Sequence, residues 1–119
     1  MNETSVKLIH GYIDAINERD GAKRRARLEE LFTEDGSYID QNLTEPYTGR
    51  DAIDQSMVDM QEHAPDDWFT VVSVLGAHND MALFTWRWGT PGGAMSRATG
   101  TDTVLFKDGR IHRIFGFIN

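Results

Sequence analysis

The chain has 119 residues, of which 39% are hydrophobic and 26% charged, and this size and balance predict one globular domain with a single core, spanning residues 1–119. Its formal net charge of −7 argues against nucleic-acid binding, because a nucleic-acid binder needs a basic face. The absence of cysteine excludes disulfides, thiolate nucleophiles and thiolate metal sites, and it agrees with a cytoplasmic location. We see no signal peptide, no internal repeat and no apolar run as long as a membrane span, so no membrane association is expected.

The first part of the chain predicts two helices. Apolar residues recur with helical spacing after Thr4 or Ser5, one of which is expected as the N-cap, and Asp20-Gly21 ends this first helix. A second, shorter helix is expected over residues 22–32. Its basic run, Lys23-Arg24-Arg25, is expected to form a solvated face.

A short strand and a third helix follow. The strand is predicted from Ser37 to Asp40, and the two-residue period places Tyr38 and Asp40 on one face of it. Residues 41–49 are predicted to be a loop. The third helix is then expected from Arg50 to His63.

The second half of the chain has the two-residue period of β-strands. Strands are predicted at Phe69–Leu75 and Met81–Trp88, followed by a final hairpin between Arg97 and Asn119. Asp108-Gly109 is a strong signal for the turn of that hairpin. The order helix, helix, strand, helix and four meandering antiparallel strands predicts an α+β domain with its helices against one sheet face.

One carboxylate is predicted in an unusual place. By the two-residue period, Asp102 shares a strand face with Ala98, Gly100, Val104 and Phe106. An ionised carboxylate among small and apolar neighbours is costly unless it is paired. Asp102 is therefore either an accident of a strand edge or a functional group.

The order of elements resembles that of the nuclear-transport-factor-two-like superfamily. The resemblance is carried by Gly49-Arg50-Asp51-Ala52-Ile53 at the start of the third helix and by Asp108-Gly109-Arg110-Ile111 in the last turn. The superfamily includes SnoaL-like polyketide cyclases, scytalone dehydratase, limonene epoxide hydrolase and ketosteroid isomerase. The resemblance covers nearly the whole chain and implies a cystatin-like cone, in which three N-terminal helices pack on a curved, mostly antiparallel sheet around a ligand pocket. It implies little about activity, because this fold hosts many chemistries and many plain binders.

Within the superfamily, the polar residues are most similar to those of the ketosteroid isomerases. Those enzymes place a tyrosine on the first helix, a base aspartate at the end of the first strand and a second aspartate on the penultimate strand. Tyr12, Asp40 and Asp102 match these three positions in turn. The resemblance implies that Asp40 moves a proton next to a carbonyl, while Tyr12 and Asp102 donate hydrogen bonds to the enolate oxygen.

Other positions depart from the isomerase pattern. Phe32 and Met57 stand where those enzymes often have tyrosines, and Gln41 replaces a usual proline. The bulk of Trp86 and Trp88 is expected to shrink the cavity, which argues against a flat steroid as the substrate. The predicted substrate-binding residues are Phe32, Met57, Trp68, Phe84, Trp86, Trp88, His112 and Ile114.

Several of these residues also have structural explanations. Tyr12 could be a core residue with a satisfied hydroxyl, and Asp40 could cap a turn. His112 would point inward if the two-residue period holds through the last strand, and it could then act as the acid or base of a dehydratase. Gly100 stands where epoxide hydrolases of this fold have an arginine, two residues before Asp102. No pair of histidines has close metal-ligand spacing, so no metal site is expected. The sequence has no glycine-rich phosphate loop and no nucleophile motif, and no cofactor is expected.

The sequence therefore predicts a cofactor-independent isomerase that moves a proton in a small apolar carbonyl compound. The alternatives are a SnoaL-like cyclase or dehydratase, or a non-catalytic small-molecule-binding domain in which the polar groups satisfy one another. The deciding feature is whether Tyr12, Asp40 and Asp102 converge on one accessible cavity. The expected partners are a small apolar ligand and a second copy of the chain, bound through the exposed sheet face as is common in this superfamily.

Overall fold

The computed structural model describes residues 2–93 and 95–119 of the chain. Its strands form one sheet in the order β2-β1-β6-β5-β4-β3, in which only the β1–β6 pair is parallel. The predicted α+β class and the predicted order of elements are confirmed, with a short additional strand, β2. The elements are α1 (Glu3–Asn17), α2 (Gly21–Leu31), β1 (Phe32–Ile39), β2 (Tyr47–Thr48), α3 (Arg50–His63), β3 (Trp68–His78), β4 (Met81–Gly89), β5 (Ser96–Lys107) and β6 (Arg110–Ile118).

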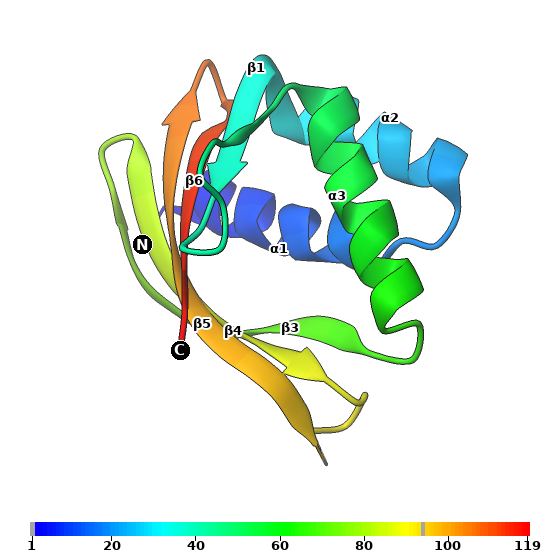
Figure 1. Cartoon of the computed structure of the whole chain (residues 1–119). Helices are drawn as coiled ribbons and strands as arrows, with labels where there is room; N and C mark the ends of the chain where they lie inside the picture. The colour runs from blue at the N-terminus through cyan, green and yellow to red at the C-terminus, as the bar shows by residue number, and fades with distance from the viewer. Residues whose placement is uncertain (1, 94) are drawn as a thin grey trace.

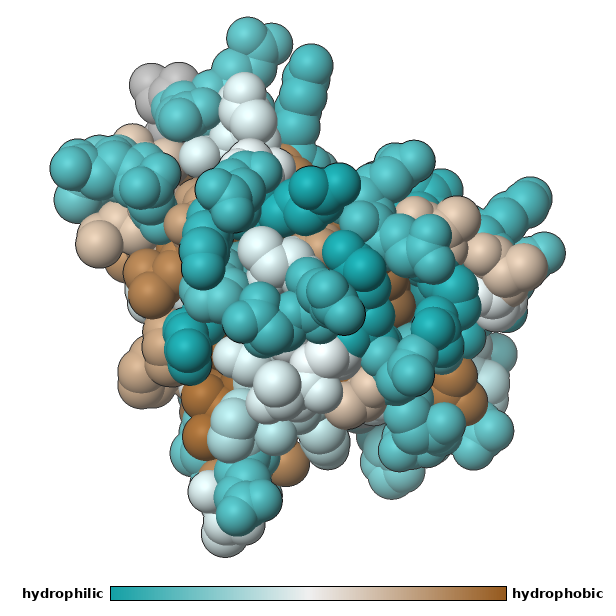
Figure 2. Space-filling model, turned by 90° about the horizontal axis from the view of Figure 1, so that it is seen from above, coloured by the Kyte–Doolittle hydropathy of each residue, from teal (hydrophilic) through white to brown (hydrophobic). Residues whose placement is uncertain are grey.

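The three helices lie on one side of a curved sheet, as Figure 1 shows. The inward-facing residues of β4 and β5 alternate as the sequence predicts: Phe84 and Trp86 are buried, and so are Asp102 and Val104. The opposite face leaves large hydrophobic side chains exposed, Phe117 among them. Seen from above in Figure 2, hydrophobic residues gather toward the sheet side on the left, while hydrophilic residues cover much of the rest. The predicted homodimer through this face stays a prediction.

The first two helices begin earlier than the sequence pattern indicates. Asn2, rather than Thr4 or Ser5, is the N-cap of α1, since its side chain accepts hydrogen bonds from the backbone N–H groups of both residues. Asp20 caps α2 by accepting from the N–H of Lys23, so that helix starts at Gly21. Asparagine and aspartate are both strong N-cap residues, which explains the shift.

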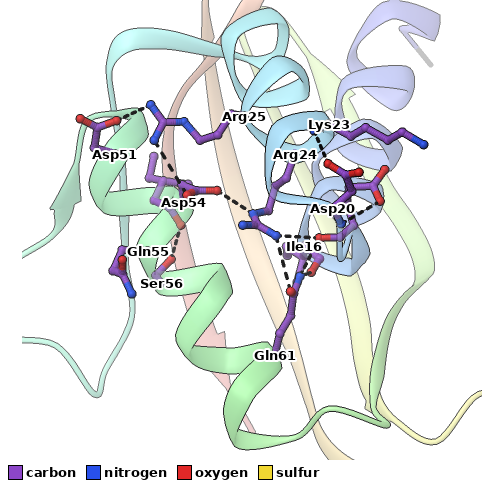
Figure 3. A network of polar contacts seen from close by, with 12 residues as sticks. Ile16, Asp20, Lys23, Arg24, Arg25, Asp51, Asp54, Gln55, Ser56 and Gln61 are labelled. Atoms are coloured by element: carbon purple, nitrogen blue, oxygen red, sulfur yellow. Dashed lines mark hydrogen bonds and ion pairs between the residues drawn. The ribbon is translucent and has the colours of Figure 1, made fainter.

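The prediction that the basic run of α2 is a solvated face is wrong for Arg24, which is only 4% exposed. Its Nε donates to Asp54 of α3 at 2.6 Å, and its Nη1 donates to the carbonyl of Glu18 at 2.8 Å (Figure 3). Gln61 of α3 also donates to the Glu18 carbonyl. A buried guanidinium needs such partners, and here they fasten α2 and the end of α1 to α3.

The first strand is longer than predicted. It starts at Phe32, directly after α2, where the sequence pattern indicates the last residue of a helix. Phe32 pairs with Ile111 of β6, and an irregularity in the register separates this pair from the regular pairing that resumes at Ser37. The pairing of Ser37 and Tyr38 with β2 then brings the segment predicted as a loop against the strand. The strand ends at Ile39, one residue before the predicted end, and Tyr38 on the strand and Asp40 directly after it both line the cavity described below.

None of the three described helices combines the length and the apolar composition that crossing a lipid bilayer requires. The third helix runs from Arg50 to His63 as predicted, and its buried residues are Ile53 and Met57. Together with α1, it forms one wall of the space above the concave face of the sheet.

Candidate functional site

A cavity of about 490 Å³ lies between the concave face of the sheet, α1 and α3. Its volume falls in the range of small-molecule pockets, about 300–1,000 Å³. The buried part of its lining comes from α1, α3, β4 and β5, and an exposed part comes from α3 and the segment after β1. The lining residues are Tyr12, Ile13, Ile16, Tyr38, Asp40, Asn42, Leu43, Tyr47, Ile53, Ser56, Met57, Asp59, Met60, His63, Phe69, Trp86, Trp88, Ala98, Asp102 and Ile118.

Tyr12 comes from the buried side of α1 and lines this cavity. Its ring packs edge-on against Phe32, with ring centroids 5.8 Å apart. The residue is only 6% exposed, yet its hydroxyl forms no hydrogen bond with the described residues. Burial, reinforced by the nearby carboxylates of Asp102 and Asp40, raises the pKa of Tyr12 well above its usual value. The hydroxyl therefore stays protonated and is free to donate to a ligand.

Asp40 follows β1 directly and holds a hydrogen bond on each carboxylate oxygen. The backbone N–H of Asn42 donates to Oδ1 at 2.8 Å, and the Tyr38 hydroxyl donates to Oδ2 at 2.7 Å. The first bond makes Asp40 a turn-capping residue, as the structural explanation predicts. Asp40 also lines the cavity, so the structural role does not remove it from the site. Burial raises the pKa of Tyr38, which keeps its hydroxyl a donor to Asp40.

Asp102 lies on β5 and is 3% exposed. The indole N–H of Trp86 donates to its Oδ1 at 2.9 Å. Burial raises the pKa of Asp102 to about 7, against the lowering effect of the Trp86 bond and with a smaller contribution from Asp40. Near neutral pH this carboxyl group is thus present both as an acid, which can donate a hydrogen bond, and as a carboxylate.

Gly116 of β6 lets these groups approach one another. It pairs with Asp102 across the β5–β6 ladder. A Cβ atom built at Gly116 would lie 2.8 Å from the Tyr38 hydroxyl and 3.1 Å from Asp102 Oδ1. A side chain here would displace one of them, so the glycine makes room for the hydroxyl of Tyr38 beside the carboxyl of Asp102.

The three residues predicted as catalytic therefore meet at one cavity, from α1, from the end of β1 and from β5. Among the predicted substrate-binding residues, Met57, Trp86 and Trp88 line it. The others lie elsewhere. Phe32, Phe84 and Ile114 are at most 1% exposed and pack in the core, and Trp68 is exposed on the surface beneath the guanidinium of Arg19.

His112 also lies outside the lining. A register shift between Leu105 and Phe106 breaks the two-residue period of β6, so that Ile111 and Ile114 are both buried. His112 Nδ1 lies instead 3.0 Å from Thr33 Oγ1 and 3.6 Å from a carboxylate oxygen of Asp35. The condition for an inward-pointing His112 fails, and with it the basis for a dehydratase that uses this residue.

Sequence reasoning missed several lining residues. Tyr38 shares a strand face with Asp40, and that alternation was a usable signal for it. Phe69 stacks on Trp88, with ring centroids 5.3 Å apart, and both line the cavity. On α3, Ser56, Asp59, Met60 and His63 also line the cavity. Counted from Ser56 they stand at i, i+3, i+4 and i+7, the spacing of one helix face.

The ionisable groups of the lining are mostly acidic. Asp40, Asp59 and Asp102 line the cavity, and none of the lining residues in the described part of the chain is lysine or arginine. The same part of the chain holds no group of three or more histidine, aspartate or glutamate side chains arranged to bind a metal ion. With three aspartates and no lysine or arginine in this described lining, an anionic ligand would meet mostly like charge, so the lining suits an uncharged ligand better.

Solved structures resemble this fold over nearly its whole length. A candidate isomerase of the SnoaL-like family from Agrobacterium tumefaciens is 25% identical, with a TM-score of 0.88 and 99% of each chain covered. A candidate ketosteroid isomerase from Kribbella flavida is 22% identical, with a TM-score of 0.75, covering 98% of this chain and 78% of its own. A protein with a cystatin-like fold from Methylobium petroleophilum is 21% identical, with a TM-score of 0.78, covering 99% of this chain and 77% of its own.

A comparison with functionally curated proteins finds no match. The model of the SnoaL-like domain matches residues 9–114, which include all three predicted catalytic residues. With the cystatin-like architecture, this match places the chain in the SnoaL-like family of the nuclear-transport-factor-two-like superfamily.

Proposed function

We propose that the protein is a cofactor-independent isomerase that moves a proton within a small, uncharged, apolar carbonyl compound. The observation that supports this proposal is the convergence of Tyr12, Asp40 and Asp102 on one cavity that is otherwise largely apolar. The likeness to candidate isomerases of the same fold is consistent with it.

In the proposed reaction, Asp40 takes a proton from the carbon next to the carbonyl group. The electrons of that C–H bond move into the new C=C bond, and those of the C=O bond move onto oxygen, which becomes an enolate. The Tyr12 hydroxyl and the protonated form of Asp102 donate hydrogen bonds to this oxygen. In a substrate with a β,γ C=C bond this enolate is a dienolate. Asp40 returns the proton to the γ carbon, where the electrons of the β,γ C=C bond form the new C–H bond, the C=C bond moves to the α and β carbons, and the C=O bond re-forms.

The buried, largely apolar part of the lining strengthens each of these interactions, because a bound substrate that displaces water there leaves the developing charge less screened. Met57, Met60, Phe69 and Trp88 would hold the body of the substrate against the sheet and α3. No step needs a metal or an electron carrier.

One observation favours a second candidate, a non-catalytic small-molecule-binding domain. Both oxygens of Asp40 already hold hydrogen bonds, from Tyr38 and from the Asn42 backbone, so the carboxylate could be a structural acceptor only. Each oxygen has a further lone pair, however, and a base needs only one.

An ultraviolet assay distinguishes the two candidates. It measures the conversion of β,γ-unsaturated cyclic ketones of several ring sizes into their conjugated isomers. The native protein should turn over at least one of them, and Asp40→Asn should lose about 10²–10⁴-fold in kcat. Asp59→Asn is the matched control, because its carboxylate lies on the exposed part of the same lining. Binding of these ketones without turnover would contradict the isomerase proposal and support the binding domain.

A further inference from the structure

Trp86 occupies a position that depends on a glycine in the neighbouring strand. The β4–β5 register pairs Trp86 with Gly100 and Phe84 with Asp102. The indole ring lies across Gly100, since a Cβ atom built there would lie 2.7 Å from the Trp86 Cε2 atom. Asp102 is thus the diagonal neighbour of Trp86, and the bare backbone of Gly100 lets the ring reach it.

The contact that results has a fixed direction. An indole N–H donates and cannot accept, so Asp102 Oδ1 must be the acceptor of the 2.9 Å bond. When the carboxyl group is protonated, its proton is therefore expected on Oδ2. The ring is held in place as well, because Trp86 is 6% exposed and packs against Phe69 with ring centroids 5.4 Å apart.

We propose that Trp86 is a positioning residue of this site, which holds Asp102 Oδ1 as an acceptor and so makes Oδ2 the oxygen that donates to a bound carbonyl compound. The role in catalysis rests on the isomerase proposed above. The fixed orientation of the acid does not, because it concerns the protein without a substrate.

Other titratable groups lie near Asp102 and can affect its protonation. Tyr12 faces it from α1, and Tyr38 and Asp40 face it from β1 and the residue after it. From α3, Asp59 and His63 reach only the exposed part of the lining.

Among these groups, Trp86 favours the ionised form, whereas burial and Asp40 favour the protonated form. The balance leaves the pKa of Asp102 at about 7, so loss of the indole donor should raise it. The oxyanion donor is then available over a wider range of pH in a variant than in the native protein.

The test without a substrate is a pH titration of the tryptophan indole N–H signals in nitrogen-15-labelled protein, since the chain has three tryptophans. The signal that disappears in Trp86→Phe should titrate with a midpoint near that of Asp102, and this titration should be absent in Asp102→Asn. Trp88→Phe is the matched control, because Trp88 points to the same cavity but has no bond to Asp102. A Trp86 signal that stays constant between roughly pH 5 and 9 would overturn the proposal.

The second arm uses a ketone that the native protein turns over. In Trp86→Phe the alkaline limb of kcat/KM should move to higher pH, while in Trp88→Phe it should stay in place. An unchanged limb in Trp86→Phe would overturn the positioning role. If no ketone is turned over but the indole signal titrates as expected, the isomerase proposal fails and the orientation of Asp102 by Trp86 stands. If Trp86→Phe folds poorly, Trp68→Phe and Trp88→Phe identify the other two indole signals, so the Trp86 signal is assigned by elimination and the first arm stays decisive.

Discussion

Two polar networks lie inside the protein, and they differ in how completely their members are satisfied. Between the helices, the buried Arg24 donates to Asp54 and to the Glu18 carbonyl, and Gln61 adds further bonds (Figure 3). At the cavity, Tyr12 has no hydrogen-bond partner among the described residues, and Asp102 has a single donor and no cation.

The difference indicates two purposes. In the helix network the buried charge of Arg24 is paired with the charge of Asp54, and this pairing lets a buried charge link α2 to α3. The cavity network keeps a donor and a carboxyl group partly unused although both residues are buried, and a bound ligand can complete their hydrogen bonds. The first network should therefore affect stability, and the second should affect binding and catalysis.

The largest effect is expected at Arg24. Arg24→Met leaves the Asp54 carboxylate, whose side chain is 15% exposed, without its closest cation. We expect the free energy of unfolding to fall by about 3–5 kcal/mol in urea denaturation. Arg27→Met is the control, because this side chain is 48% exposed and pairs with Glu18 and not with Asp54, and it should cost less than about 1 kcal/mol. Equal effects of the two variants would remove the distinction between a buried and a surface network.

The pH dependence of the free energy of unfolding should reveal the cost of ionising the buried Asp102. Because the pKa of Asp102 is about 7 in the folded protein and lower in the unfolded chain, the folded state binds the extra proton between about pH 4 and 7. Stability should thus fall as pH rises through this window. Asp102→Asn cannot ionise, so its stability relative to the native protein should improve by roughly 2–4 kcal/mol between about pH 4 and 8. Parallel pH profiles for the two proteins would contradict a buried, titrating Asp102.

A smaller effect, and one on turnover alone, is expected at Tyr12. Tyr12→Phe removes a hydroxyl that has no hydrogen-bond partner within residues 2–93 and 95–119, so stability should change by less than about 1 kcal/mol. If the hydroxyl donates to the enolate oxygen, kcat should fall about 10²-fold. Tyr47→Phe, at another tyrosine of the lining, serves as the control and should change kcat by less than about tenfold. A loss of stability in Tyr12→Phe with unchanged kcat would make Tyr12 a core residue only.

The smallest effect is expected from crowding the cavity network. Gly116→Ala places a methyl group against the Tyr38 hydroxyl and Asp102, and it should destabilise the fold by about 1–2 kcal/mol and lower turnover. Gly76→Ala, on β3, is the matched control, since no atom lies within 4 Å of its added methyl group. Thermal unfolding of both variants checks this prediction, and similar melting temperatures would show that the space at Gly116 is not used.

The two-residue period predicted the strand faces where the pairing is regular. It placed Trp86 and Trp88 on the cavity side and Asp102 among buried neighbours, and the structure agrees. It failed at His112, because a register shift inside β6 depends on the pairing with β5 and leaves no local pattern. Such irregularities arise from contacts between strands that are distant in sequence.

The partners of polar groups were the least predictable feature. A basic run on a short helix is typical of a solvated face, and only the approach of α3 gives Arg24 its buried partner, Asp54. The bonds of Asp40 with Tyr38 and of Asp102 with Trp86 likewise depend on rotamers and on space above glycines. Residue types and spacing can therefore indicate a cavity with carboxylates, but the hydrogen bonds that set their chemistry come from tertiary packing.

The most direct test of the central claim is proton abstraction itself. Exchange of the hydrogen atoms next to the carbonyl of a saturated cyclic ketone, dissolved in heavy water and followed by NMR, reports enolate formation without requiring isomerisation. We predict exchange at least about 10²-fold faster than in buffer with the native protein, and a return to the buffer rate with Asp40→Asn. A ketone that binds the native protein and exchanges only at the buffer rate would contradict the assignment of Asp40 as a base.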